Sequence, residues 1–114
     1  MNKTVSLKKN HEFRRAYGRG KSAATPRLVM YCVKNRLGVT RLGITVSKKF
    51  GNAVHRNRAK RRIREAYRLT GDGLRAGYDL VIVARGRCEG ARFDELCGDI
   101  STLAEKLGIR EDGI

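Results

Sequence analysis

The residues with the most distinctive chemistry are the cations between Lys48 and Arg68. This stretch holds nine Lys and Arg residues and one acid, Glu65. Ammonium and guanidinium groups bind phosphates, and the planar guanidinium of Arg can also make two parallel hydrogen bonds to one phosphate or stack on a base. The stretch therefore predicts a surface that binds nucleic acid.

The direction of each side chain on a helix follows from its position, because successive residues turn by about 100°. With Arg56 at zero, a polar stripe spans about 40° to 140° and contains Lys60, Arg64, Asn57, Arg68 and Arg61. An apolar stripe at about 280° to 340° contains Ala66, Ala59 and Ile63. We expect the small apolar residues to pack on a sheet and to hold the cations outward on a rigid helix.

The alternative for such a charge run is a solvated helix face. A solvated face usually mixes charges, because Glu and Lys four residues apart stabilise a helix by ~0.2 to 0.5 kcal/mol and like charges oppose it by a similar amount. Here Lys60 lies four residues before Arg64, and Arg64 lies four before Arg68. A phosphate backbone would relieve this repulsion, so we favour a nucleic-acid interface.

Aromatic residues near the start of the chain favour RNA over duplex DNA as the partner. Phe13 and Tyr17 are four residues apart, so their rings lie on one face of a short helix, and Tyr31 can join them from a strand. Such rings stack on unpaired bases, at ~1 to 3 kcal/mol per base. The alternative is a place in the core, which stays open for Phe13, whereas the hydroxyls of Tyr17 and Tyr31 favour a half-exposed cleft.

A nuclease site carried by the protein itself is not indicated. It would need clustered carboxylates or histidines for metal or acid-base chemistry. The basic part of the chain offers His11, His55, Glu12 and Glu65. Asp94, Glu95 and Asp99 lie close in sequence, but Asp94 and Glu95 are adjacent and diverge by about 100° on a helix, which makes a poor metal cage.

Hydrophobic periodicity predicts six elements that would position these side chains. Asn10 is the expected N-cap of a helix over 10–17, which Gly18 and Gly20 end. Two strands that form a hairpin follow, and then come the cationic helix, a strand buried on both faces and an amphipathic helix. Their ranges are about 27–34, 39–47, 54–69, 78–84 and 91–107. This order predicts an α/β (α+β) sandwich in which a small sheet packs against helices.

Length and charge agree with one nucleic-acid-binding unit. The 114 residues fit a single domain, 1–114, with one modest core. We expect the first few residues and the C-terminal tail to be loose. The formal charge of +15 and the pI near 10.6 indicate a polyanionic partner. Residues 1–68 hold 20 Lys and Arg and two acids, so the positive charge is concentrated in this part of the chain.

Compartment and redox state follow from what the composition lacks. We find no apolar run of signal-peptide or transmembrane length, so we expect a soluble, cytoplasmic protein without a membrane partner. Cys32, Cys88 and Cys97 are odd in number and form no C-x-x-C pair, which argues against a disulfide framework or a zinc finger. We interpret them as reduced thiols, with Cys32 buried in a strand.

The cationic stretch also resembles a known signature. The run SKKFGNAVHRNRAKRRIRE at 47–65 is similar to the "RNR" motif of the bacterial ribonuclease P protein. The similarity extends back through LKKN at 7–10 and the pair Phe13 and Tyr17, and forward to DLVIVAR at 79–85, so it covers nearly the whole chain.

The resemblance implies a more detailed fold than periodicity does. It implies a single domain of order αβββαβα, with an additional short strand near 18–22 and a small mixed sheet. It also implies an unusual left-handed βαβ crossover through the cationic helix, although such crossovers are right-handed in about 98% of cases.

The resemblance further implies the function of a ribonuclease P subunit. Such a subunit binds the catalytic RNA and the 5′ leader of precursor tRNA, and it assists the Mg²⁺-dependent endonucleolytic removal of that leader. The catalytic centre and most of the Mg²⁺ would lie in the RNA, so we expect no catalytic or metal-binding residue in this chain and no obligate protein partner. The expected RNA contacts are Lys48, Lys49, Arg56, Asn57, Arg58, Lys60, Arg61, Arg64 and Arg68. The expected leader cleft contains Phe13, Tyr17 and Tyr31.

Two rival functions stay open at the level of sequence. A ribosomal or general RNA-binding protein would share the composition, but it would not need Phe13 and Tyr17 on one helix face. An autonomous metal-dependent nuclease would cleave precursor tRNA without any RNA subunit.

Overall fold

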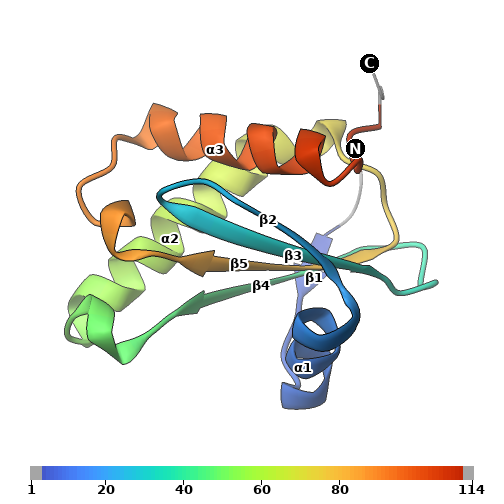
Figure 1. Cartoon of the computed structure of the whole chain (residues 1–114), viewed down its shortest axis with the longest axis horizontal. Coiled ribbons are helices and arrows are strands. Elements are labelled where there is room, and N and C mark those ends of the chain that lie inside the picture. Colours follow the sequence, from blue (N-terminus) through green and yellow to red (C-terminus); the bar gives the residue numbers. More distant parts are fainter. Residues whose placement is uncertain (1–3, 112–114) are drawn as a thin grey trace.

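The computed structural model describes residues 4–111, so the prediction of loose ends falls on residues 1–3 and 112–114, outside the described part. Three helices and five strands make up the fold (Figure 1). The strands are β1 (Thr4–Ser6), β2 (Lys21–Ala24), β3 (Leu28–Lys34), β4 (Thr40–Val46) and β5 (Tyr78–Ala84). The helices are α1 (Asn10–Arg19), α2 (Ala53–Thr70) and α3 (Phe93–Lys106), with short 3-10 turns η1 (Lys48–Phe50), η2 (Gly71–Gly73) and η3 (Gly86–Cys88).

The five strands form one mixed sheet in the order β1-β4-β5-β3-β2. β5 is the central strand, parallel to β4 and antiparallel to β3. The predicted hairpin between the strands over 27–34 and 39–47 is therefore wrong, because β5 lies between β3 and β4. The physical reason is the apolar run of β5. Leu80, Val81 and Ile82 are at most 1% exposed, and a central strand covered on both faces buries all three.

The sheet separates two unequal layers of helices (Figure 1). α2 and α3 cover one face, where the main core contains Leu28, Met30 and Cys32 of β3 together with the apolar side of α2. α1 lies on the other face, against a smaller cluster around Val81. Since α1 is a single short helix, part of this second face stays accessible beside it, and Tyr31 and Val83 are half-buried there.

The connection from β4 through α2 to β5 joins two adjacent parallel strands, as the βαβ prediction requires. The left hand of this crossover stays a prediction from the family resemblance. The cationic helix extends one residue beyond the predicted range at each end, and the strand over 78–84 is confirmed residue for residue.

The first helix differs from its prediction at both ends. Its N-cap is Lys9, not Asn10, because Glu12 accepts a hydrogen bond from the Lys9 backbone N–H at 3.1 Å and so closes the first turn one residue earlier. The helix continues through Gly18 to Arg19 and ends where the Gly20 N–H bonds the Ala16 carbonyl. The additional strand predicted near 18–22 therefore begins later, at Lys21.

The strand β1 was not predicted from the sequence. It pairs in parallel with β4 at the edge of the sheet, with Thr4 opposite Thr40 and Ser6 opposite Leu42. Three residues are too few to show a period of two, so the strand has no recognisable pattern. It flanks the C-terminal half of α2, where Thr4 lies 3.4 Å from the Tyr67 hydroxyl.

Candidate nucleic-acid interface

α2 has defined ends, so its cations are presented by a rigid helix. The Asn52 side chain accepts a hydrogen bond from the His55 backbone N–H at 3.1 Å, which caps the N-terminus. Gly51 precedes it with a φ of 146°, and a Cβ there would lie 3.1 Å from Nδ1 of His55. Glycine is therefore the residue that fits this turn. At the other end the Gly71 N–H bonds the Tyr67 carbonyl.

The apolar stripe of α2 faces the core, as the sequence predicts. Ile63 and Ala66 are fully buried and Ala59 is 6% exposed. On the opposite side Asn57, Arg61 and Arg64 are exposed, and Arg56 and Lys60 are half-exposed. Lys48 and Lys49 are exposed in η1, just before the helix. The buried apolar stripe thus directs the opposite side of the helix outward. We call this side the α2 face and define it as Arg56, Asn57, Lys60, Arg61 and Arg64.

Arg64 and Arg68 differ in their partners although both are exposed. Arg68 is bound to Glu65 at 2.6 to 3.1 Å, and this hydrogen bonding raises the pKa of Arg68 and lowers the pKa of Glu65. Arg64 makes no ion pair with any acid in residues 4–111. The helix therefore compensates the charge of Arg68 and leaves that of Arg64 free for an anion.

Arg58 lies apart from the α2 face. It lines a small cavity of about 70 Å³ together with Phe50, Cys88 and Glu89. Arg62 lies on the same flank, where its guanidinium donates a short hydrogen bond to the Ala91 carbonyl. Of the predicted RNA contacts, Arg58 is therefore on a different side of α2 from Arg64.

The predicted cleft residues Tyr17 and Tyr31 meet on the other face of the sheet. Their ring centroids are 4.9 Å apart and their planes are at 83°, an edge-to-face contact. The Tyr17 hydroxyl lies 3.2 Å from Oγ1 of Thr45 on β4. Tyr17 is 41% exposed, so one side of its ring is open to a ligand.

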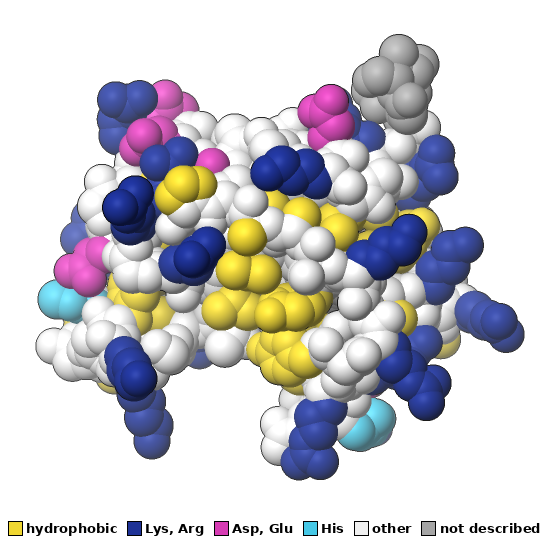
Figure 2. All heavy atoms as spheres, viewed as in Figure 1, with side chains coloured by type: hydrophobic (Ala, Val, Ile, Leu, Met, Phe, Trp, Pro, Cys, Tyr) yellow, Lys and Arg dark blue, Asp and Glu magenta, His cyan; other side chains and the backbone are white. Residues whose placement is uncertain are grey.

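Phe13 is placed more deeply than Tyr17. It packs with the cluster of Leu7, Ala16 and Val81, and its ring lies over Gly43, where a Cβ would come within 2.5 Å of the ring. It also lines an open groove of about 350 Å³ together with Asn10, Arg14, Tyr17 and Thr45. Figure 2 shows hydrophobic surface between the sheet and α1, with Lys and Arg side chains around it. Phe13 is thus both part of the core and a wall of the groove.

A buried ionic network fixes α1 against the sheet. Asp79 of β5 is fully buried and accepts hydrogen bonds from Nε and Nη2 of Arg41 at 2.8 and 2.7 Å, and from Nδ2 of Asn35 at 2.9 Å. Burial opposes ionisation of this carboxyl, but the hydrogen bonds from Arg41 and Asn35 outweigh it and lower the pKa of Asp79.

The network reaches α1 at two points. Arg41 makes a short ion pair with Glu12 in the first turn of the helix. Arg15, one turn later, donates to the Lys34 carbonyl at 2.7 Å and lies 3.7 Å from Asp79. These contacts orient α1, and with it Phe13 and Tyr17. Sequence reasoning missed these contacts because the partners are at least 19 residues apart and share no local motif.

A metal site would need several carboxylate, imidazole or thiolate groups close together. In the described part of the chain, no three His, Cys, Asp or Glu side chains are grouped so that they could hold a metal. Three of the four acids of α3 are in ion pairs, with Asp99 and Glu95 bound to Arg27 and Asp94 bound to Arg92. The side chains of residues 4–111 therefore do not form a Mg²⁺ site by themselves.

The sequence is similar to proteins of one family. A family model described as ribonuclease P matches residues 1–108. The ribonuclease P protein component of Caldanaerobacter subterraneus subsp. tengcongensis is 46% identical over 110 residues, which are 96% of this chain and 95% of the relative. That of Clostridium acetobutylicum is 45% identical over 105 residues, which are 90% of this chain and 88% of the relative.

Solved structures agree with this assignment. The ribonuclease P protein of Staphylococcus aureus matches with a TM-score of 0.78 at 31% identity, over 93% of this chain and 97% of the other. That of Thermotoga maritima matches with a TM-score of 0.81 at 28% identity, over 89% of this chain and 96% of the other. The chain belongs to the ribonuclease P protein family and is a protein subunit of ribonuclease P.

Proposed function

We propose that this subunit uses its two faces for two RNAs. The α2 side binds the catalytic RNA, and the groove between α1 and the sheet binds the single-stranded 5′ leader of precursor tRNA. Together they assist endonucleolytic removal of the leader, which gives the mature 5′ end of the tRNA. The observation that supports the proposal most is that Arg64 is exposed and has no acidic partner within residues 4–111, while Ile63 on the apolar side of the same helix is fully buried.

The contacts to the catalytic RNA are electrostatic in the first place. Phosphates of a folded RNA present closely spaced charges, and each cation that replaces a counterion contributes to affinity in a salt-dependent way. The α2 face supplies such cations at helical spacing, and η1 extends it. The residues assigned to this contact are Lys48, Lys49, Arg56, Asn57, Arg58, Lys60, Arg61, Arg64 and Arg68. Arg58 and Arg68 would contribute less, because one lies on another flank and the other is already paired with Glu65.

The leader groove suits unpaired nucleotides. Tyr17 offers an accessible ring, Tyr31 supports it edge-on, and Phe13 forms the wall beneath. Bases of a single strand can stack on such rings without a requirement for sequence. Arg14 at the rim of the groove is exposed and can meet the backbone phosphates.

The chemistry that the protein supports is hydrolysis of one phosphodiester bond. The Mg²⁺ on which this reaction depends would be held mainly by the RNA subunit. The protein holds and orients its two RNA partners and contributes no catalytic side chain. We expect the assembled ribonucleoprotein in the cytoplasm, with no membrane and no obligate protein partner. Within residues 4–111, no helix is long and apolar enough to cross a bilayer.

The experiment is reconstitution with a bacterial ribonuclease P RNA at low Mg²⁺ concentration. We expect the protein to restore cleavage of precursor tRNA that the RNA alone performs poorly under these conditions. The protein without RNA should leave precursor tRNA intact. Cleavage by the protein alone would support an autonomous nuclease, and failure to restore cleavage would support a general RNA-binding protein.

A further inference from the structure

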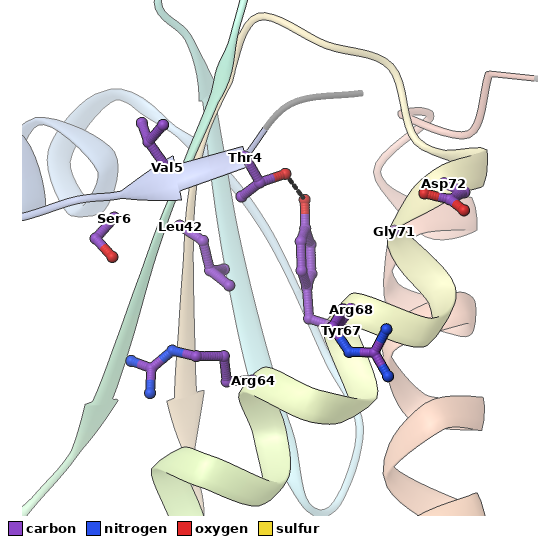
Figure 3. A pocket seen from close by; sticks show the side chains of 9 residues that line it. All are labelled: Thr4, Val5, Ser6, Leu42, Arg64, Tyr67, Arg68, Gly71 and Asp72. Atoms are coloured by element: carbon purple, nitrogen blue, oxygen red, sulfur yellow. Dashed lines mark hydrogen bonds between the residues drawn. The ribbon is translucent and has the colours of Figure 1, made fainter. Parts of the chain in front are cut away.

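A pocket of about 370 Å³ lies between β1 and the C-terminal half of α2 (Figure 3). β1 contributes Thr4, Val5 and Ser6, and β4 contributes Leu42. Arg64, Tyr67 and Arg68 come from α2, and Gly71 and Asp72 from the turn that follows. Its volume is in the range of cavities that hold small organic ligands. The pocket is on the α2 side of the sheet, away from the leader groove.

The wall of this pocket combines apolar and hydroxyl groups. Leu42 and Tyr67 are 9% and 5% exposed, so the apolar part of the pocket wall is continuous with the core. The Tyr67 hydroxyl lies 3.4 Å from Oγ1 of Thr4, and this contact joins α2 to the start of β1 at one end of the pocket. Ser6 is on the same face of the strand as Thr4, because alternate residues of a strand share a face. Such a lining suits a flat, partly polar ring.

The arginines at the rim of the pocket favour a ligand whose ring carries an anionic group. In Figure 3, Arg64 and Arg68 extend to opposite sides of Tyr67. Arg68 is paired with Glu65, whereas Arg64 has no acidic partner in the described part of the chain. Asp72 is the one acid that lines the pocket, and it comes from the end beyond Tyr67. A free guanidinium beside an apolar cavity matches a phosphate next to a base.

We propose that this pocket takes one unpaired nucleotide of the catalytic RNA, with the base against Leu42 and Tyr67 and its phosphate on Arg64. The inference rests on the proposed function, since it assumes that the α2 face meets that RNA. It adds a specific contact to an electrostatic one. A nucleotide that leaves the RNA stack to enter the pocket would set the register of the protein on the RNA, which phosphate contacts alone define poorly.

The test fills the pocket without changing charge. Ser6 is exposed, so Ser6→Leu should fold, and its side chain would occupy the space of the base. We expect the affinity for a bacterial ribonuclease P RNA to fall about five- to 150-fold, the equivalent of the ~1 to 3 kcal/mol that a stacked base is worth. The slope of log affinity against log salt should fall by no more than the roughly 0.7 to 0.9 that one phosphate contact contributes, because the substitution removes no charge and only the phosphate of the displaced nucleotide can leave Arg64. Ser6→Ala, which keeps the space, should lose less than Ser6→Leu.

Two comparisons make the outcome specific. Thr102→Leu places the same bulk on an exposed hydroxyl position of α3 and should bind the RNA as the wild type does. A fully paired RNA duplex has no nucleotide to insert, so Ser6→Leu and wild type should bind it equally. Wild-type affinity of Ser6→Leu for the ribonuclease P RNA, or an equal loss for the duplex, overturns the pocket proposal. If Arg64→Ala still lowers the salt slope in that case, the proposed function of the α2 face stands.

Discussion

Arg41 of β4 clamps the buried carboxylate of Asp79 on the neighbouring β5 through two hydrogen bonds, at 2.8 and 2.7 Å. The same guanidinium makes an ion pair with Glu12 of α1. The centre of the sheet is thereby connected to α1, the helix that forms one wall of the proposed leader groove. A change at Asp79 should thus affect both stability and the proposed leader binding, although the residue is fully buried.

The first prediction concerns the strength of this clamp. Asp79→Asn leaves Arg41 without its buried counterion and should lower the free energy of unfolding by ~3 kcal/mol, at the lower end of the cost of breaking a buried ion pair because Asn keeps an acceptor. Denaturant unfolding measures it. Glu65→Gln removes the partner of Arg68 at the surface and serves as the control, with little change expected. Equal stability of the two variants would mean that the clamp is not stabilising.

The second prediction concerns acid stability. The pKa of Asp79 in the folded protein is below its unfolded value of about 3.9. A carboxyl of this kind contributes stability above its unfolded pKa, and the contribution is lost as the pH falls through the folded pKa. The wild type should therefore lose stability below about pH 4, and Asp79→Asn should lose less over the same range. Unfolding free energies between neutral and strongly acidic pH test this, and parallel curves would contradict it.

The third prediction concerns the leader groove. Tyr17→Ala removes an exposed ring and should reduce the preference for precursor over mature tRNA by about fivefold or more, the value of one stacked base. Binding of the catalytic RNA should change little. Tyr17→Phe keeps the ring and loses the contact with Thr45, so it should retain most of the preference. Equal losses for precursor and mature tRNA would place Tyr17 in a structural role instead.

The fourth prediction concerns the close approach of α1 to the sheet. A Cβ at Gly43 would lie 2.5 Å from the Phe13 ring, so Gly43→Ala must displace that ring. We expect a loss of ~1 to 3 kcal/mol in the free energy of unfolding, as in overpacked cores. Gly98→Ala in α3, where nothing lies within 4 Å of the new Cβ, should instead stabilise the protein by up to ~1 kcal/mol. Similar thermal stability of the two variants would show that Phe13 is free to move.

Local patterns explain which parts of the structure could be predicted. The orientation of Ile63 against Arg64 follows from the angle per residue on one helix, and the burial of Val81 follows from an uninterrupted apolar run. Both signals are contained within a few residues. The partner strand of β3 is decided by competition among distant segments, and there the expected hairpin with β4 gave way to the more apolar β5.

The candidate site divides in the same way. The cations of α2 and the pair Phe13 and Tyr17 are visible in sequence because their spacing is helical. In the sequence Asp79 is a polar residue near the start of an apolar strand, and no neighbouring residue in the sequence indicates that Arg41 binds it. The pocket beside β1 is equally hidden, because Tyr67 continues the apolar stripe of α2 and only the fold brings Thr4 next to it.

The central claim is that α2, held against the sheet by its buried apolar side, presents Arg64 to RNA phosphates. Its most direct test is the affinity for ribonuclease P RNA at a series of salt concentrations, for wild type, Arg64→Ala and Arg68→Ala. Loss of one phosphate contact lowers the slope of log affinity against log salt by roughly 0.7 to 0.9. We predict this drop for Arg64→Ala and a smaller one for Arg68→Ala, whose charge Glu65 already compensates. An unchanged slope for Arg64→Ala would remove Arg64 from the interface and contradict the account.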